Sequence, residues 1–392
     1  MTEDLQKGLR EIPACEILDK IQTGEPVEYD HVIIKGDLNL NELNLPTEHV
    51  VLTEFQAKTL MLFEESIVVT SPIIFTNSKF DGNLNFSDHL FKNPIEIKYT
   101  EFGGEALFIG AIFNGKTDFS GAIFGRVARF WGATFSEKAD FSKITFGEMA
   151  NFRGAIFSRE ARFWGATFRK DSDFEKATFN GEANFIRSRF DDIANFNATF
   201  SGVLDLEESK IYSMHLSNAI FENTSIISLR FSDFVRLEIR WKSIRDKIKY
   251  DGSAYLALVR NFNSLELFND ADECYYQYRT VRRKENLNGI ITKLLDYVAW
   301  IAYGYGVRPG NPLILSLGLF LISIFVFVSG FGLQNPLGSM INATYLSVFV
   351  FTSSPKTDPL TGLYGIWGMI ERIAGWLLMA CFLVVLAKKT LR

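Results

Sequence analysis

The chain has 392 residues, a formal net charge of −5 and a hydrophobic content of 47%. The length suits two or three domains, and so small a net charge does not indicate a nucleic-acid partner or an acidic one. Three scattered cysteines, Cys15, Cys274 and Cys381, exclude a disulfide framework and a C-x-x-C zinc site and suit a reducing cytoplasm.

The N-terminal region is acidic, with fourteen acidic and five basic residues between positions 1 and 72. We expect residues 1–30 to form a solvated acidic cap on the domain that follows. This stretch has no apolar run flanked by positive charge, so we expect no secretory signal.

A repeat dominates the soluble part of the chain. From Phe75 to Phe196 a large apolar residue, nearly always phenylalanine, recurs at alternating intervals of five and six residues. Of the eighteen phenylalanines from Phe108 to Phe200, fourteen have alanine two positions earlier. Neither a helix nor a single strand has this period, whereas a solenoid does. We expect square coils of about 22 residues, with phenylalanine and alanine inside and the extra residue at a corner.

The unit is plainest at residues 130–135 (FWGATF) and again at 163–168. It resembles the pentapeptide-repeat family in its phenylalanine-rich form. The resemblance implies a right-handed quadrilateral β-helix, which we expect over residues 31–234. Residues 75–200 carry sixteen acidic and sixteen basic residues, so DNA mimicry by an acidic surface, known among relatives, is not expected.

No part of the sequence is typical of a catalytic or metal-binding site. There is no glycine-rich phosphate loop, nucleophile elbow or paired-carboxylate motif, so we expect no enzyme, cofactor or metal. Trp131 and Trp164 each follow an inward phenylalanine and should point outward on opposite faces. The four histidines form no ligand spacing: His31, His49, His89 and His215.

After the repeat the period becomes helical, and residues 235–310 are expected to form a connector. Apolar residues three or four apart predict short helices at 236–249, 254–268, 271–284 and 290–302. The last of these has an apolar side with Trp300 and Tyr303 as interface anchors. We expect it to lie along the inner lipid headgroups as an amphipathic helix.

The C-terminal part, residues 311–392, contains two segments able to cross a membrane, at 311–332 and 363–388. Between them lies an apolar segment, 340–352, that is too short to cross ~30 Å of hydrocarbon. This order indicates a pore, or else two anchor helices joined by a surface hairpin. Lysine and arginine gather before the first span and after the second, so we expect a two-span plasma-membrane protein with both termini in the cytoplasm.

The same order of elements resembles the two-transmembrane potassium channels. Residues 343–352 resemble their pore helix, and residues 371–376 resemble the start of their inner helix. Fusions of pentapeptide repeats to such a pore module form a recognisable bacterial and archaeal group. The resemblance implies a re-entrant pore helix, a gating hinge at Gly375 and a homotetramer.

The chain departs from that family at the selectivity filter. The pattern T-V-G-Y-G is absent, so the glycines that would let carbonyl groups turn inward are missing, and two prolines fix φ and remove hydrogen-bond donors. Potassium selectivity is therefore not expected. Lys356 on the axis would favour anions, Asp358 would favour cations, and a pair of the two would give weak selectivity; a solvated loop is the alternative. The filter-equivalent residues are Thr352, Ser353, Ser354, Pro355, Lys356, Thr357 and Asp358.

Other candidates lie along the second span. Large residues such as Met379 and Phe382 are candidates for lining or narrowing the pore. Glu371 and Arg372 are candidates for an ion pair between subunits, because unpaired charges in a membrane are costly.

These features predict an oligomeric ion channel, a tetramer by resemblance, with a cytoplasmic β-helix as sensor or scaffold. Its partners would be membrane lipid and permeant ions, with no nucleic acid. The alternative is a membrane-anchored pentapeptide-repeat scaffold that does not conduct. The sequence does not identify the gating stimulus or any ligand of the repeat.

Overall fold

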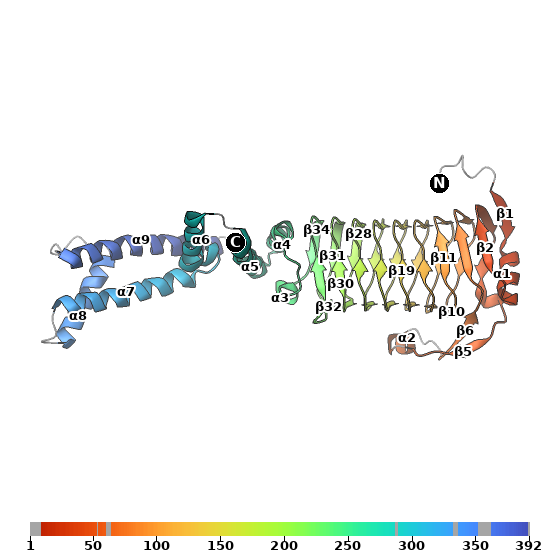
Figure 1. Ribbon diagram of the computed structural model, residues 1–392, viewed down its shortest axis with the longest axis horizontal. Helices are drawn as coiled ribbons and strands as arrows, with labels where there is room; N and C mark the ends of the chain where they lie inside the picture. Colours follow the sequence, from red (N-terminus) through yellow and green to blue (C-terminus); the bar gives the residue numbers. More distant parts are fainter. Residues whose placement is uncertain are drawn as a thin grey trace. The chain divides into compact units, whose positions relative to one another are not determined.

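The computed structural model describes residues 9–52, 54–59, 64–286, 289–331, 336–351 and 362–390. The chain divides into two compact units, Met1–Leu265 and Glu266–Arg392. The first is a β-solenoid of about ten turns followed by two short helices, and the second is helical (Figure 1).

The solenoid strands form four ladders of stacked strands, one on each side of the coil. The first ladder contains β2 (Val27–Asp30), β7 (Ile73–Thr76), β11 (Ile95–Lys98), β15 (Thr117–Asp118), β19 (Ala139–Asp140), β23 (Ala161–Arg162), β27 (Ala183–Asn184), β30 (Val203–Asp205) and β33 (Ile226–Ser228). The second contains β1 (Arg10–Pro13), β3 (Val32–Lys35), β8 (Lys79–Phe80), β12 (Glu101–Phe102), β16 (Ile123–Phe124), β20 (Thr145–Phe146), β24 (Thr167–Phe168), β28 (Arg189–Asn195), β31 (Lys210–His215) and β34 (Asp233–Glu238).

The third ladder joins the second through the long strand β28, and contains β4 (Leu38–Asn39), β9 (Leu84–Asn85), β13 (Ala106–Leu107), β17 (Ala128–Arg129), β21 (Ala150–Asn151) and β25 (Ser172–Asp173). The fourth contains β5 (Thr47–His49), β6 (Glu65–Val69), β10 (His89–Phe91), β14 (Ile112–Phe113), β18 (Thr134–Phe135), β22 (Ile156–Phe157), β26 (Thr178–Phe179), β29 (Thr199–Phe200) and β32 (Ile220–Phe221). The pairs within the ladders are parallel except β5 with β6.

The register confirms the predicted coil length. Thr117 pairs with Ile95 in the turn before it and with Ala139 in the turn after it. Between residues 73 and 195, strand partners across adjacent turns are 22 residues apart, as in the hydrogen bond from Asn195 to Asp173. Stacked backbone amides therefore bond to the turns on either side, as expected for parallel strands.

Phenylalanine and alanine fill the solenoid interior, as the repeat predicts. Phe130, Ala128 and Ala133 have no exposed surface. The ring of Phe130 stacks on those of Phe108 and Phe152, with centroid distances of 4.5 Å and 4.7 Å. Each such aromatic pair adds about 0.5–1.5 kcal/mol of stability beyond that from burying its apolar surface. The core is therefore stabilised by a column of equivalent contacts.

The extra residue of each six-residue interval was expected to lie at a corner, and this stays a prediction. The corners with a left-handed backbone instead lie in the five-residue intervals, two positions after the first inward residue, with φ between 49° and 69°, a region that costs energy for residues other than glycine. These corner residues are Asn77, Asp88, Tyr99, Gly110, Gly121, Gly132, Lys143, Gly154, Gly165, Lys176 and Arg187.

The solenoid extends further at both ends than the expected range of 31–234. At its beginning, β1 pairs with β3, and α1 (Ala14–Thr23) packs there with Ile17 and Ile21 buried, in the region expected to be only a solvated cap. A 3-10 helix, η2 (Leu40–Glu42), and α2 (Glu54–Thr59) interrupt the early turns.

At the other end the helix expected at 236–249 is wrong. Residues up to Glu238 belong to β34, because Leu237 alternates inward as in a strand. Two short helices follow, α3 (Trp241–Ile244) and α4 (Gly252–Ser264). The side chain of Asn261 in α4 exchanges two hydrogen bonds with the backbone of Leu237, of 2.9 Å and 2.8 Å, and so occupies the edge of the last strand.

The second unit contains α5 (Phe268–Asn286), α6 (Ile290–Tyr303), the 3-10 helix η3 (Gly304–Gly306), α7 (Gly310–Phe331), α8 (Pro336–Phe351) and α9 (Gly362–Thr390). Both α7 and α9 are long and apolar enough to cross a membrane. The short helix α8 contacts both of them.

Candidate functional site

An apolar cluster fixes α8 to the two long helices. Phe327 of α7 and Ala343 and Val350 of α8 are buried together, and Trp367 of α9 packs against them. At ~1.5 Å per residue, the 16 residues of α8 would span about 24 Å, which is less than the hydrocarbon thickness of a membrane. The structure thus places a helix too short to cross against two that are long enough.

Two hydrogen bonds also link these helices inside the apolar surroundings. Ser347 Oγ of α8 donates to Glu371 Oε1 of α9 at 2.5 Å. Trp367 Nε1 of α9 donates to Ser323 Oγ of α7 at 3.0 Å. Ser323, Ser347 and Glu371 all have no exposed surface. Polar contacts of this kind hold helices in a defined register where apolar packing alone would allow sliding.

Glu371 is the one of these residues that sequence reasoning placed in the site. Its second oxygen, Oε2, is buried and has no hydrogen-bond partner among the described residues. Arg372, the other half of the predicted ion pair, is exposed on α9. Because Glu371 is turned toward α8 of its own chain, the two neighbouring side chains point in different directions, and a pair between subunits stays a prediction.

Gly375 lies against the last residue of α8. A β-carbon at this position would be 2.9 Å from Cε2 of the Phe351 ring, closer than ordinary van der Waals contact. The absence of a side chain at Gly375 therefore lets α9 approach Phe351. Since Phe351 immediately precedes Thr352, the predicted hinge touches the residue that leads into the filter-equivalent segment.

A pocket of about 480 Å³ opens beside this contact. It brings together two predicted residues, Gly375 and Met379, whereas Phe382 is not among its lining residues. The pocket is mainly apolar and is lined by Phe351, Gly375, Trp376, Met379, Ala380 and Leu383. The filter-equivalent residues, Thr352–Asp358, lie outside the described residues.

The connector holds a separate charged network at the start of α7. Arg279 Nη2 of α5 and the Tyr305 hydroxyl of η3 both donate to the buried Asp296 of α6, at 2.8 Å and 2.6 Å. Burial, together with the bond to Asp296, raises the pKa of Tyr305 well above its usual range. Asp296 therefore ties the start of the first apolar helix to α5 and α6.

The apolar side of α6 faces outward, with Ile290 87% exposed. The other exposed apolar residues of this helix are Ile291, Leu294, Leu295, Val298 and Ile301. In a surface helix of a soluble protein the apolar residues face the core and the charged ones face water. In α6 the carboxylate of Asp296 is buried and the apolar residues are exposed, which is the reverse.

Sequence reasoning missed Ser323, Ser347 and Trp367. The signal that could have found them is Glu371 itself, because a carboxyl group in an apolar segment needs a donor from a neighbouring helix. Few donors are available in α8, and Ser347 is one of them. Within the described ranges there is no group of three or more His, Cys, Asp or Glu side chains that could hold a metal ion.

Comparison with known proteins supports the solenoid alone. A family model described as "Pentapeptide repeats (9 copies)" matches residues 97–137, 130–178 and 166–210. No curated protein and no solved structure matches the chain. Over the matched residues, the solenoid is therefore built of pentapeptide repeats.

Proposed function

We propose that the protein is an oligomeric membrane ion channel, with α9 lining the pore and the solenoid acting as a cytoplasmic sensor or scaffold. The observation that carries this proposal is the way α8 is held between α7 and α9. Two anchors joined by a surface hairpin would have no need for a buried Ser347–Glu371 hydrogen bond or for contact between Phe351 and Gly375.

The exposed surface of the helical unit supports a position in the membrane. The apolar windows of α7 and α9 are each only 17% buried, so most of their apolar residues need lipid or another subunit to cover them. The outward apolar side of α6 suits the interfacial region, and the arginines and lysines beside it favour a cytoplasmic position in this proposal. A tetramer is the arrangement implied by the resemblance to two-transmembrane channels.

Selectivity in this proposal depends on the segment after α8. In a fourfold ring, Lys356 would contribute four positive charges and Asp358 four negative ones. The absence of filter glycines argues against a stack of carbonyl sites selective for potassium. The channel is proposed to separate ions by charge sign rather than by size.

Reconstitution into planar lipid bilayers tests this proposal. We expect unitary currents from the full-length protein, and a reversal potential under asymmetric KCl that reveals the preferred sign of charge. Asymmetric KCl and NaCl should show little discrimination between the two cations. Lys356→Gln and Asp358→Asn should shift the KCl reversal potential in opposite directions, whereas Lys389→Gln, at the far end of α9, should leave it unchanged.

Two results together would reject conduction. One is the absence of currents under voltage, membrane tension and pH change. The other is a monomer or dimer in detergent without a central axis surrounded by α9. These results would favour the membrane-anchored scaffold.

A further inference from the structure

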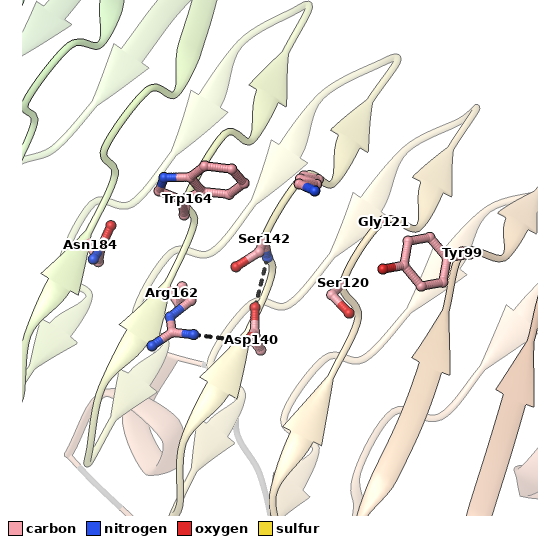
Figure 2. A pocket seen from close by; sticks show the side chains of 9 residues that line it. Tyr99, Ser120, Gly121, Asp140, Ser142, Arg162, Trp164 and Asn184 are labelled. Carbon is pink, nitrogen blue, oxygen red and sulfur yellow. Dashed lines mark hydrogen bonds and ion pairs between the residues drawn. The ribbon is translucent and has the colours of Figure 1, made fainter.

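A hollow of about 420 Å³ lies on the outer surface of the solenoid, beside the first ladder (Figure 2). A volume of this size suits a small organic ligand. The hollow belongs entirely to the first unit and has no part in the proposed conduction. Its lining residues are Tyr99, Ser120, Gly121, Asp140, Ser142, Lys143, Arg162, Trp164 and Asn184.

The hollow exists because the repeat places side chains of different size at equivalent positions. Ser142 stands at the position equivalent to Trp164 one turn earlier, and Ser120 stands there two turns earlier. Backbone hydrogen bonds between successive turns keep these three residues in register. The two serines leave open space in front of the indole. At the other end, the Tyr99 ring lies over Gly121, where a β-carbon would be only 2.3 Å from the ring. Two aromatic side chains thus bound a floor of small residues.

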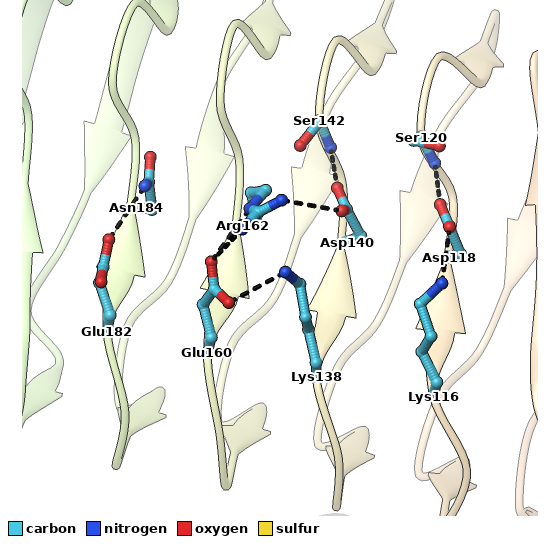
Figure 3. Close-up of polar contacts among 10 residues, drawn as sticks. All are labelled: Lys116, Asp118, Ser120, Lys138, Asp140, Ser142, Glu160, Arg162, Glu182 and Asn184. Atoms are coloured by element: carbon cyan, nitrogen blue, oxygen red, sulfur yellow. Dashed lines mark hydrogen bonds and ion pairs between the residues drawn. The ribbon is translucent and has the colours of Figure 1, made fainter.

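The acidic and basic groups along the first ladder mostly neutralise each other (Figure 3). Arg162 pairs with Glu160 at 2.8 Å and with Asp140 at 3.7 Å, and Lys138 pairs with Glu160 at 3.0 Å. Burial of Glu160 opposes ionisation, but the bonds from Lys138 and Arg162 outweigh it and lower the pKa of this carboxyl. Asp140 also accepts a hydrogen bond from the backbone N–H of Ser142.

Lys143 differs from these residues because it has no carboxylate partner within the part of the chain that the structure describes. Its Nζ lies 5.3 Å from the centre of the Trp164 ring, and its side chain is exposed. A cation on an aromatic face is stabilised by about 0.5–1 kcal/mol at such sites, which holds it in place without neutralising it. With Asp140 and Arg162 compensating each other, the lining keeps one positive charge.

We propose that this hollow binds a small aromatic carboxylate. A flat ring fits over the small floor between Tyr99 and Trp164, and a single carboxylate group balances the charge of Lys143. A nucleoside phosphate would bring more negative charge than one lysine compensates. A neutral ring would leave the charge of the Lys143 ammonium uncompensated.

Isothermal titration calorimetry with full-length protein in detergent tests the proposal, with indole-3-acetate as the probe. Indole-3-acetamide, which has the same ring without the charge, should bind at least tenfold more weakly. Adenosine monophosphate should also bind more weakly than indole-3-acetate. Binding of either compound as tight as that of indole-3-acetate or tighter, or no heat from indole-3-acetate at millimolar concentration, would overturn the proposed ligand class.

Two variants test whether the probe binds in the hollow or in the detergent micelle. Ser142→Trp should abolish binding by filling the floor, and it should fold because the equivalent position one turn later already carries Trp164. Lys143→Gln should weaken binding about tenfold or more. The corner position of Lys143 is occupied by tyrosine, glycine and arginine in other turns, so this change should be tolerated.

Lys210→Gln is the matched control, because Lys210 is also an exposed lysine of the solenoid but is not among the lining residues. It should bind indole-3-acetate as the unchanged protein does. Circular dichroism should show the same solenoid signal for all three variants. If folded Ser142→Trp or Lys143→Gln binds the probe as tightly as Lys210→Gln, the hollow is not the site.

Discussion

The solenoid and the helical unit are stabilised in opposite ways. The solenoid repeats one contact many times, with phenylalanine stacked on phenylalanine and each turn bonded to its two neighbours. The helical unit depends on single contacts without a duplicate, such as Ser347 with Glu371 and Gly375 with Phe351. A substitution in the solenoid should therefore lower stability by an amount that depends on how deeply the replaced side chain is buried. A substitution in the helical unit should instead alter the position of one helix.

The largest effect is expected from Phe152→Ala in the middle of the solenoid. Phe152 has no exposed surface and stacks on Phe130 and Phe174, at 4.7 Å and 4.9 Å. Removing the ring opens a cavity that neighbouring turns cannot fill, since each is fixed by its own hydrogen bonds. We expect a loss of about 3–5 kcal/mol in the free energy of unfolding, measured by chemical denaturation followed by circular dichroism.

Phe221→Ala provides the comparison within the same repeat. Phe221 lies on the last strand of the fourth ladder, is only partly buried and stacks on one ring, that of Phe200 at 5.4 Å. Its loss should cost clearly less than that of Phe152. Equal losses at the two positions would contradict the view that each turn is stabilised by its neighbours.

The solenoid was predictable because its signal is repeated. Every turn from Phe75 to Phe196 restates the same spacing, so the coil length and the inward residues followed from the sequence, whereas the left-handed corners lie in the five-residue intervals and were not predicted. The strands before residue 31 were missed, because the excursion through β5 and α2 separates β2 from its partner β7 by 46 residues, as for Val27 and Ile73, instead of 22. Where the period was interrupted, the sequence pattern no longer showed which strands pair.

The helical unit was predictable only in part. The lengths of α7 and α9 follow from their composition, and the hydrophobic pattern also indicated α6. The Ser347–Glu371 bond joins residues 24 positions apart and depends on where two helices cross, which hydropathy does not determine. The hollow beside Trp164 was missed for another reason: it arises from small residues in earlier turns, whereas sequence reasoning predicted only that the tryptophan points outward.

Ser347→Ala tests whether single contacts govern the helical unit. It leaves Glu371, which is fully buried, without its hydrogen bond to α8. We expect a loss of about 1–3 kcal/mol, because an unpaired buried polar group costs more than a hydrogen bond contributes. Thermal unfolding in detergent measures this effect.

The double variant Ser347→Ala/Glu371→Leu serves as the control for Ser347→Ala. Removing both partners should recover part of the loss, because no polar group is then left unsatisfied. Additive losses would show that the Ser347–Glu371 bond does not couple α8 to α9.

Gly375→Ala should have a smaller effect on stability and a clear one on conduction. The added methyl group comes within 2.9 Å of the Phe351 ring, so the end of α8 must shift, while alanine improves the helix propensity of α9 by about 1 kcal/mol. The two terms oppose each other, and we expect a net loss of about 0–2 kcal/mol. Single-channel recordings should show an altered conductance or open probability.

Gly318→Ala in α7 is the matched control for that variant. A β-carbon at Gly318 meets nothing within 4 Å, so only the gain in helix propensity remains. The protein should be slightly more stable, with unchanged currents. If both glycine variants alter conduction alike, the contact with Phe351 is not the cause.

The smallest effect is expected from Lys116→Gln on the solenoid surface. Lys116 pairs with Asp118 at 3.2 Å, but its side chain is 48% exposed, and solvent screens the attraction. Such pairs contribute about 0–1 kcal/mol. Asp118 also keeps the hydrogen bond from the backbone N–H of Ser120, so the turn should not change. Denaturation at low and high salt should give nearly equal values for this variant and the unchanged protein. A loss as large as that of Ser347→Ala would mean that the solenoid, too, depends on individual contacts, and the contrast between the two units would fail.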